Sequence, residues 1–186
     1  MIFRLSRALC TKVKAGALGA MPPHENPLLD WSAHVFVVDR KQFILLCNTG
    51  SLLAVVVEGK EVTNEDSFRE RAFEGMQAFM ASLGYDSAFQ TVISASREPL
   101  RFAKPLNRSV LGSMNDLIRC AKSKIRSNDF TAIEIIDRLN IMPMSMLAMR
   151  TSRSYAIPRD VFREMVNKAG FDADRSPTGD RHNLPG

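Results

Sequence analysis

The sequence has few of the residues on which most catalytic and metal sites are built. Its 186 residues include three histidines and three cysteines, and Cys10, Cys47 and Cys120 are widely spaced with no C-x-x-C pair among them. Such a set predicts neither a disulfide framework nor a zinc site, and we expect the cysteines to be small packing residues in a reducing compartment. We therefore expect no bound metal and no cofactor.

Long apolar runs are also missing. The longest, Leu52 to Val57, is far shorter than the roughly 20 residues that a membrane-spanning helix needs, so we expect no membrane span. Residues 1–14 are basic and free of acids, as in a targeting peptide, but they lack a continuous apolar stretch and have the pattern of a strand followed by a helix. We expect them to be part of the fold and the protein to be cytoplasmic.

The motifs that identify common enzyme classes are absent as well. Neither of the two glycine-rich phosphate-binding patterns occurs, and the segment from Leu111 to Asn115 lacks the second glycine of a G-x-S-x-G nucleophile turn. His24 falls in a proline-rich stretch and His182 in a polar terminal stretch, whereas His34 falls on a predicted strand. Without a nucleophile motif beside it, His34 is expected to be structural, and the sequence assigns no enzyme class.

Composition and length indicate a folded domain. Hydrophobic residues make up 45% of the chain and charged residues 24%, and 186 residues suffice for one well-buried core. We expect a single α+β domain over residues 1–170, with a proline-rich loop at 15–30 and a disordered tail at 171–186 that is rich in Asp, Arg, Ser, Pro and Gly. A pI near 9.4 favours contact with anionic partners.

Apolar periodicity places the elements. Alternating and β-rich runs predict strands at residues 1–5, 31–38, 42–47, 52–57 and 100–104, with the middle three joined as an antiparallel meander. Helical spacing and capping residues predict helices at about 6–13, 63–83, 86–98, 107–126, 131–139 and 158–169, where Thr63 with Asp66 and Thr131 with Glu134 resemble capping boxes. We expect a mostly antiparallel sheet covered by two long amphipathic helices, and a Met-rich, irregular segment at 141–155.

Most charged side chains outside these helices are expected to be solvent-exposed. This applies to Arg4, Arg7, Lys12 and Lys14 near the N-terminus, while Asp30 is one of several scattered acids that do not form a catalytic pair.

The stretch from Arg101 to Arg126 concentrates the positive charge. It holds seven Lys or Arg and one acid, Asp116, although the excess over the whole chain is only five. One side of the predicted helix is apolar, and the other side aligns Arg108, Gly112, Asn115, Arg119, Lys122 and Arg126. Gly112 inside this helix would let a neighbouring strand or a ligand approach the backbone closely.

Two interpretations of this basic side stay open, a solvated face and a surface that binds an anion or nucleic acid. Lys104 and Arg108 flank the exposed N–H groups at the helix start, the usual ingredients of an anion site. Our candidate anion-binding residues are Lys104, Asn107, Arg108, Ser109, Arg119 and Lys122.

Three functions remain as hypotheses. The first is a binding protein that contacts nucleic acid or another polyanion through the basic helix 108–126. The second is an enzyme for a small anionic substrate at the junction 104–109, with His34, Asp30 or the proline-rich loop closing over it. The third is a homo-oligomer or partner subunit joined through the Met-rich segment 142–149, whose Met142, Met144 and Met146 suit an adaptable interface better than a Cu(I) site.

The segment from Phe102 to Leu117 has the pattern F-A-K-x-x-N-R-S-V-L-G-S-M-N-D-L. It resembles the signature of a family of small bacterial proteins classed as a domain of unknown function, family 6933. The similarity extends from the N-terminal strand through Trp31 to Pro143 and Met144, which is most of the chain. The resemblance implies no activity, cofactor or site residue.

Overall fold

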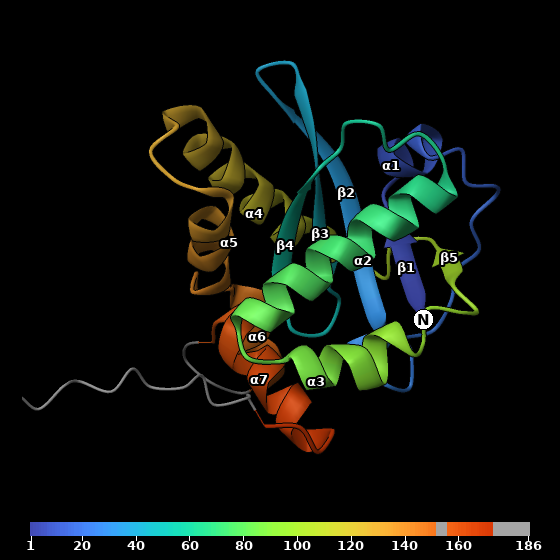
Figure 1. Ribbon diagram of the computed structural model, residues 1–186, viewed down its shortest axis with the longest axis vertical. Coiled ribbons are helices and arrows are strands. Elements are labelled where there is room, and N and C mark those ends of the chain that lie inside the picture. Colours follow the sequence, from blue (N-terminus) through green and yellow to red (C-terminus); the bar gives the residue numbers. More distant parts are fainter. Residues whose placement is uncertain (152–155, 173–186) are drawn as a thin grey trace, which may run out of the picture.

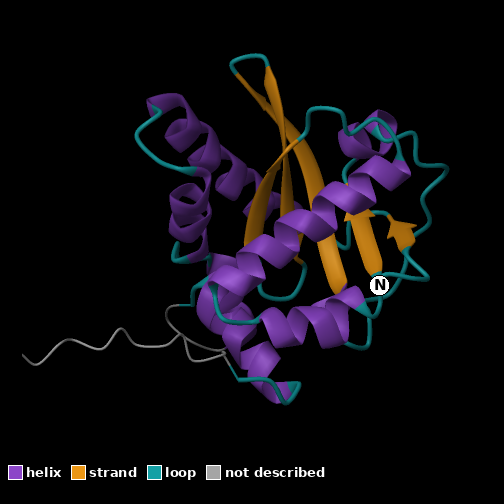
Figure 2. Ribbon diagram, viewed as in Figure 1, coloured by secondary structure: helices purple, strands orange, loops and turns teal. Residues whose placement is uncertain are grey.

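The computed structural model describes residues 1–151 and 156–172, which form a five-stranded sheet with helices on both faces (Figures 1 and 2). The strands are β1 (Ile2–Leu5), β2 (Asp30–Val38), β3 (Lys41–Asn48), β4 (Ala54–Glu58) and β5 (Arg101–Ala103). The helices are α1 (Arg7–Lys12), η1 (Pro27–Leu29), α2 (Glu65–Ser82), α3 (Asp86–Ala88), η2 (Phe89–Ser94), α4 (Arg108–Ser127), α5 (Ala132–Asn140), α6 (Ser145–Thr151) and α7 (Pro158–Lys168). Among the described residues, no helix is both long and apolar enough to cross a membrane.

The sheet is mixed, with the strand order β4-β3-β2-β1-β5. β2 pairs with β3, and β3 with β4, in antiparallel fashion, whereas β1 is parallel to both β2 and β5. The α+β class is confirmed, but the expectation of a mostly antiparallel sheet is wrong. Short turns join β2, β3 and β4 and make them antiparallel, while α1 and the loop 15–30 carry the chain back across the sheet and place β1 parallel to β2.

Successive side chains of each central strand point to opposite faces of the sheet, so they belong to two separate hydrophobic cores. On one face, Trp31 and Ala33 pack under α2, which lies diagonally across the sheet in Figure 1. On the other face, Phe36 and Val38 pack under α4. The cover is not made by two long helices alone, because α1, η2 and α7 also contribute to the first core and α5, α6 and α7 to the second.

Local capping explains where most helices begin. The expected capping box of Thr131 with Glu134 is confirmed at the start of α5, and Asn107 caps α4. The box expected at Thr63 and Asp66 is displaced by one residue, since Asn64 and Ser67 make it instead. The segment 141–155 is not wholly irregular, because α6 begins at Ser145.

Some predicted ends also move. The strand expected at 52–57 begins only at Ala54, because Leu52 takes a left-handed conformation with φ 60° in the loop after β3. Of the predicted tail 171–186, Phe171 and Asp172 are among the described residues, and Phe171 packs against the first core. The remaining residues of that tail lie outside the described part of the chain.

The two mid-helix glycines, Gly75 in α2 and Gly112 in α4, have opposite surroundings. A Cβ at Gly75 would overlap Cγ1 of Val57, so α2 approaches the sheet too closely there for a side chain to fit without a shift. A Cβ at Gly112 would have no atom within 4 Å, so no strand lies against this glycine.

The same substitution should therefore have opposite effects at the two positions. Gly75→Ala overpacks the α2–β4 contact, and we expect a loss of about 1–2 kcal/mol in the free energy of unfolding. Gly112→Ala removes a poor helix former without a clash and should add about 1 kcal/mol. Urea denaturation of both variants measures this, and equal changes would contradict the packing described here.

Candidate functional site

The predicted basic helix corresponds to α4. Asn107 caps it by accepting a hydrogen bond from the Val110 amide at 2.9 Å, and it ends where Asn128 turns left-handed with φ 55°. Its buried side is apolar and consists of Val110, Met114, Leu117, Ile118 and Ala121. This packing fixes the rotation of the helix and turns the polar side outward.

The outward side carries the predicted stripe of cations. Arg108, Arg119 and Arg126 are exposed and Lys122 is half-buried. Arg119 lies 3.4 Å from Asp116 and Arg126 lies 3.7 Å from Asp39, both in exposed ion pairs. Pairs of this kind contribute at most about 1 kcal/mol, so they compete weakly with an external anion.

The junction 104–109 lies at the N-terminal end of α4. Lys104 donates its backbone amide to Gly19 O at 2.9 Å, while its side chain is exposed, as are Asn107, Arg108 and Ser109. Leu106 lines a cavity of about 260 Å³, but the other walls come from Pro23, His24, Pro27, Asp30, Thr49 and Gly50. The structure therefore gathers the four junction residues on a surface and leaves them outside that cavity.

His34 lies beneath α4 and away from the junction cavity. It sits on the face of β2 that also carries Phe36 and Val38, and its Nδ1 is buried without a hydrogen-bond partner among the described residues. Burial first, and then the charge of Lys122, lowers the pKa of His34. The ring is thus neutral at neutral pH and close to Lys122.

Arg4 and Asp30 form a buried ion pair beside the cavity that Leu106 lines, and sequence reasoning missed this pair. Arg4 was expected to be exposed but is 1% accessible. Its Nε and Nη2 donate to the two oxygens of Asp30, each at 2.7 Å. The expectation failed because the pairing depends on β1 lying beside β2, a contact between positions 26 residues apart.

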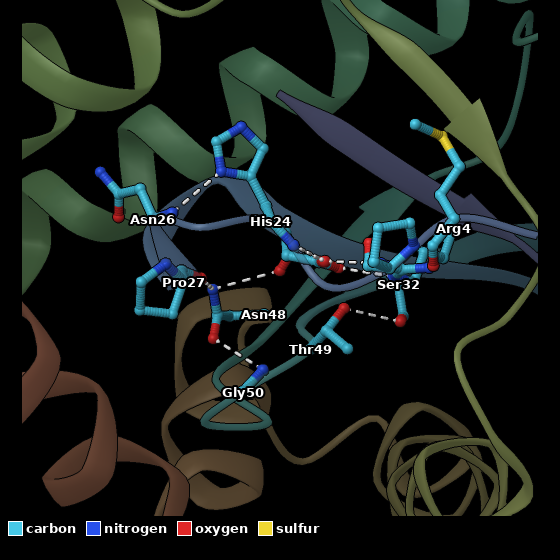
Figure 3. A network of polar contacts seen from close by, with 11 residues as sticks. Arg4, His24, Asn26, Pro27, Ser32, Asn48, Thr49 and Gly50 are labelled. Atoms are coloured by element: carbon cyan, nitrogen blue, oxygen red, sulfur yellow. Dashed lines mark hydrogen bonds and ion pairs between the residues drawn. The ribbon is translucent and has the colours of Figure 1, made fainter.

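The same pair holds the proline-rich loop. Arg4 donates to Met21 O at 3.0 Å and to Pro22 O at 2.8 Å, and the His24 amide donates to Asp30 at 2.9 Å (Figure 3). His24 in turn accepts the Asn26 amide at its Nδ1, at 3.0 Å. The loop that the sequence left irregular is therefore tied to the first two strands by charge-assisted hydrogen bonds.

Asn48 organises the neighbouring loop between β3 and β4. Its Nδ2 donates to Pro27 O at 2.8 Å, and its Oδ1 accepts the amide of Gly50 (Figure 3). The same Oδ1 also accepts the amide of Ser51. Beside it, the hydroxyls of Ser32 and Thr49 lie 2.9 Å apart. Both loops that wall the 260 Å³ cavity are thus held by buried side chains.

The carboxylate of Asp30 is held in its charged form. Burial alone would raise the pKa of Asp30, but hydrogen bonds from Arg4, the His24 amide and the Thr49 hydroxyl outweigh burial and lower that pKa. A carboxylate that accepts this many hydrogen bonds is a poor general base. Asp30 therefore anchors the cavity wall and does not offer acid–base chemistry at neutral pH.

A second concave surface lies between α4 and the Met-rich segment. This groove has a volume of about 600 Å³ and is lined by Ser113, Asp116, Arg119, Cys120 and Ser123 of α4 and by Met142, Pro143, Met144, Ser145 and Met146. Within the described residues, no group of three His, Cys, Asp or Glu side chains is placed to hold a metal ion.

A comparison with protein-family models matches residues 2–161 to the family described as "Domain of unknown function (DUF6933)". The match includes β1, the central strands, α4 and α5. No curated protein and no solved structure matches the chain.

The buried ion pair makes a strong prediction about stability. Arg4→Met leaves the Asp30 carboxylate buried and uncompensated, and we expect a loss of about 3–5 kcal/mol in the free energy of unfolding. Arg163 forms an ion pair of the same 2.7 Å length with Asp160, but it is exposed, so Arg163→Met is a matched control that should cost about 1 kcal/mol or less. Equal losses in the two variants would contradict the role given to Arg4.

The pair also predicts a pH dependence. Because the pKa of Asp30 is lowered in the folded chain, its carboxylate contributes stability above the ordinary value of 3.8. That contribution disappears as the pH falls through the lower, folded-state pKa. The double variant Arg4→Met, Asp30→Leu should lose less stability than the two single variants together and should show a shallower loss in acid, as measured by chemical denaturation between pH 7 and pH 2.

Proposed function

The chain belongs to the family described as a domain of unknown function (DUF6933), and we propose that it is a binding protein that contacts a polyanion, nucleic acid first among them, through the exposed face of α4. Open space at Gly112, one turn after the start of the stripe, is the observation that carries the proposal. No described part of the chain covers this position, so Arg108 and Arg119 on either side of it meet solvent or a partner.

The length of the stripe suits an extended partner better than a small molecule. Arg108 and Arg126 are 18 residues apart, which corresponds to about 27 Å along a helix. A duplex axis of that length carries roughly 16 phosphate charges. Four cations along it can neutralise a few of these charges but cannot converge on one small ligand.

Such a surface lacks the features that read base sequence. The stripe has no aromatic side chains on which bases could stack, and Asn115 alone among its uncharged residues has a polar side chain, which is too little for a base-specific pattern. The expected binding is therefore weak in sequence preference and strong in salt dependence. Each neutralised phosphate contributes about 0.9 to the slope of log K against log salt, so four contacts predict a slope of about −3.6.

The enzyme hypothesis remains a second candidate, supported by the cavity beside Leu106. Its walls include Asp30 and His24, but Asp30 is saturated with hydrogen bonds. A substrate there would meet His24 and the loop prolines before any of the four predicted junction residues. An enzyme site at the junction is therefore less well supported than polyanion binding along the α4 face.

Charge reversal tests the polyanion proposal. The variant Arg108→Glu, Arg119→Glu, Lys122→Glu should bind a 20-base-pair duplex at least about 30-fold more weakly, with the salt slope reduced by about 3. Fluorescence anisotropy between 50 and 200 mM NaCl measures both quantities. The control Arg7→Glu, Lys14→Glu, Lys168→Glu makes the same charge change at exposed sites away from α4. If the two variants lose affinity equally, net charge and not the α4 face governs binding.

Self-association through the Met-rich segment 142–149 is a third proposal, and Met149, which is 75% exposed, supports it. If this segment joins two copies, Met149→Lys should shift the sedimentation coefficient of the protein from that of an oligomer to that of a monomer. A wild-type chain that sediments as a strict monomer at 100 µM would reject the proposal.

A further inference from the structure

A basic cavity of about 440 Å³ opens at the end of the sheet opposite the Asp30 cluster. Three separate segments form it: α1, the β2–β3 hairpin, which rises above the helices in Figure 1, and the loop after β4. The lining residues are Lys12, Arg40, Lys41, Gln42, Phe43, Glu58, Gly59, Lys60 and Glu61. Cations outnumber carboxylates in this lining, and none of the four cations belongs to α4.

These cations are poorly neutralised by the protein itself. Within the described residues, Lys12, Arg40 and Lys41 make no ion pair, and Lys60 has one loose contact of 3.7 Å with Glu61. Like charges that face one concave space repel one another, and this repulsion is relieved when an anion enters. The lining of the cavity therefore carries a net positive charge, because four cations are accompanied by only two carboxylates, Glu58 and Glu61.

The backbone holds this lining at a conformational cost. Arg40 has φ 67° and Glu61 has φ 65°, values that favour glycine or asparagine. Arg40 occupies the second central position of a two-residue hairpin turn with Asp39, where glycine is the usual residue. Glycine would adopt this turn with less strain than arginine. The presence of Arg40 here therefore points to a role for its guanidinium in binding and not in stabilising the fold.

Two further contacts shape the cavity. Lys12 is positioned by its hydrogen bond to Oε1 of Gln42. A Cβ at Gly59 would lie 3.2 Å from backbone and side-chain atoms of Gln42, so the loop after β4 packs tightly against β3.

We propose that this cavity binds the phosphate group of a small phosphorylated molecule. Its volume lies within the usual 300–1,000 Å³ of small-ligand sites, and guanidinium and ammonium groups are the usual partners of phosphate. The site is independent of the α4 face, since the two share no residue.

The experiment uses the full chain with inorganic pyrophosphate and adenosine 5′-monophosphate as probes, titrated calorimetrically in 150 mM NaCl. We expect saturable binding of at least one probe with one site per chain. Arg40→Gly should weaken that binding at least tenfold while leaving the Tm unchanged or higher, because glycine adopts the left-handed turn without strain.

Lys14→Gly is the matched control. Lys14 is exposed, has φ 56° and does not line the cavity, so this variant removes one charge and the same kind of strain without touching the site. It should bind the probes as the wild type does, and so should the triple α4 variant. The proposal is overturned if neither probe binds saturably, if both glycine variants lose affinity equally, or if only a nucleic-acid duplex responds to Arg40→Gly. That last result would make the hairpin cations part of a polyanion surface.

Discussion

The hydrogen-bonded ion pair between Arg4 and Asp30 is the contact on which the arrangement of the molecule most depends. It joins the middle of β1 to the first residue of β2, and through Met21 and Pro22 it draws the proline-rich loop against the sheet. Burial of two charges is expensive unless every polar atom finds a partner, and here the guanidinium and the carboxylate are bound on several sides. The parallel half of the sheet and the loop that crosses it are therefore stabilised together.

The sequence predicted well what local interactions decide. The starts of α4 and α5 follow from Asn107 and Thr131, whose side chains cap amides three residues away, and the apolar side of α4 follows from its periodicity. Prediction from the sequence failed where the structure depends on contacts between segments that are far apart in the chain. Neither the parallel direction of β1 nor the burial of Arg4 can be read from neighbouring residues, because both depend on where β2 lies after a long crossover.

The candidate binding surfaces were likewise predictable from the sequence only in part. The charge of the α4 face follows from helical spacing alone, so its residues could be named in advance. The cavity beside Leu106 and the basic cavity at the hairpin are built from segments that the fold brings together, such as α1 with the loop after β4. Of those parts, the left-handed Arg40 was the least accessible to sequence reasoning, because arginine is an unusual residue for its turn.

An exposed ion pair between Arg126 and Asp39 links the α4 face to the turn between β2 and β3. In our proposal, a polyanion lies along α4 from Arg108 toward this contact. Amide chemical-shift mapping of the full chain during titration with a DNA duplex locates the bound polyanion on the surface. We expect shifts concentrated on the exposed positions of α4, including Gly112 and Asn115, with α2 on the opposite face unaffected. Shifts centred on α2, or none at saturating duplex and low salt, would contradict it.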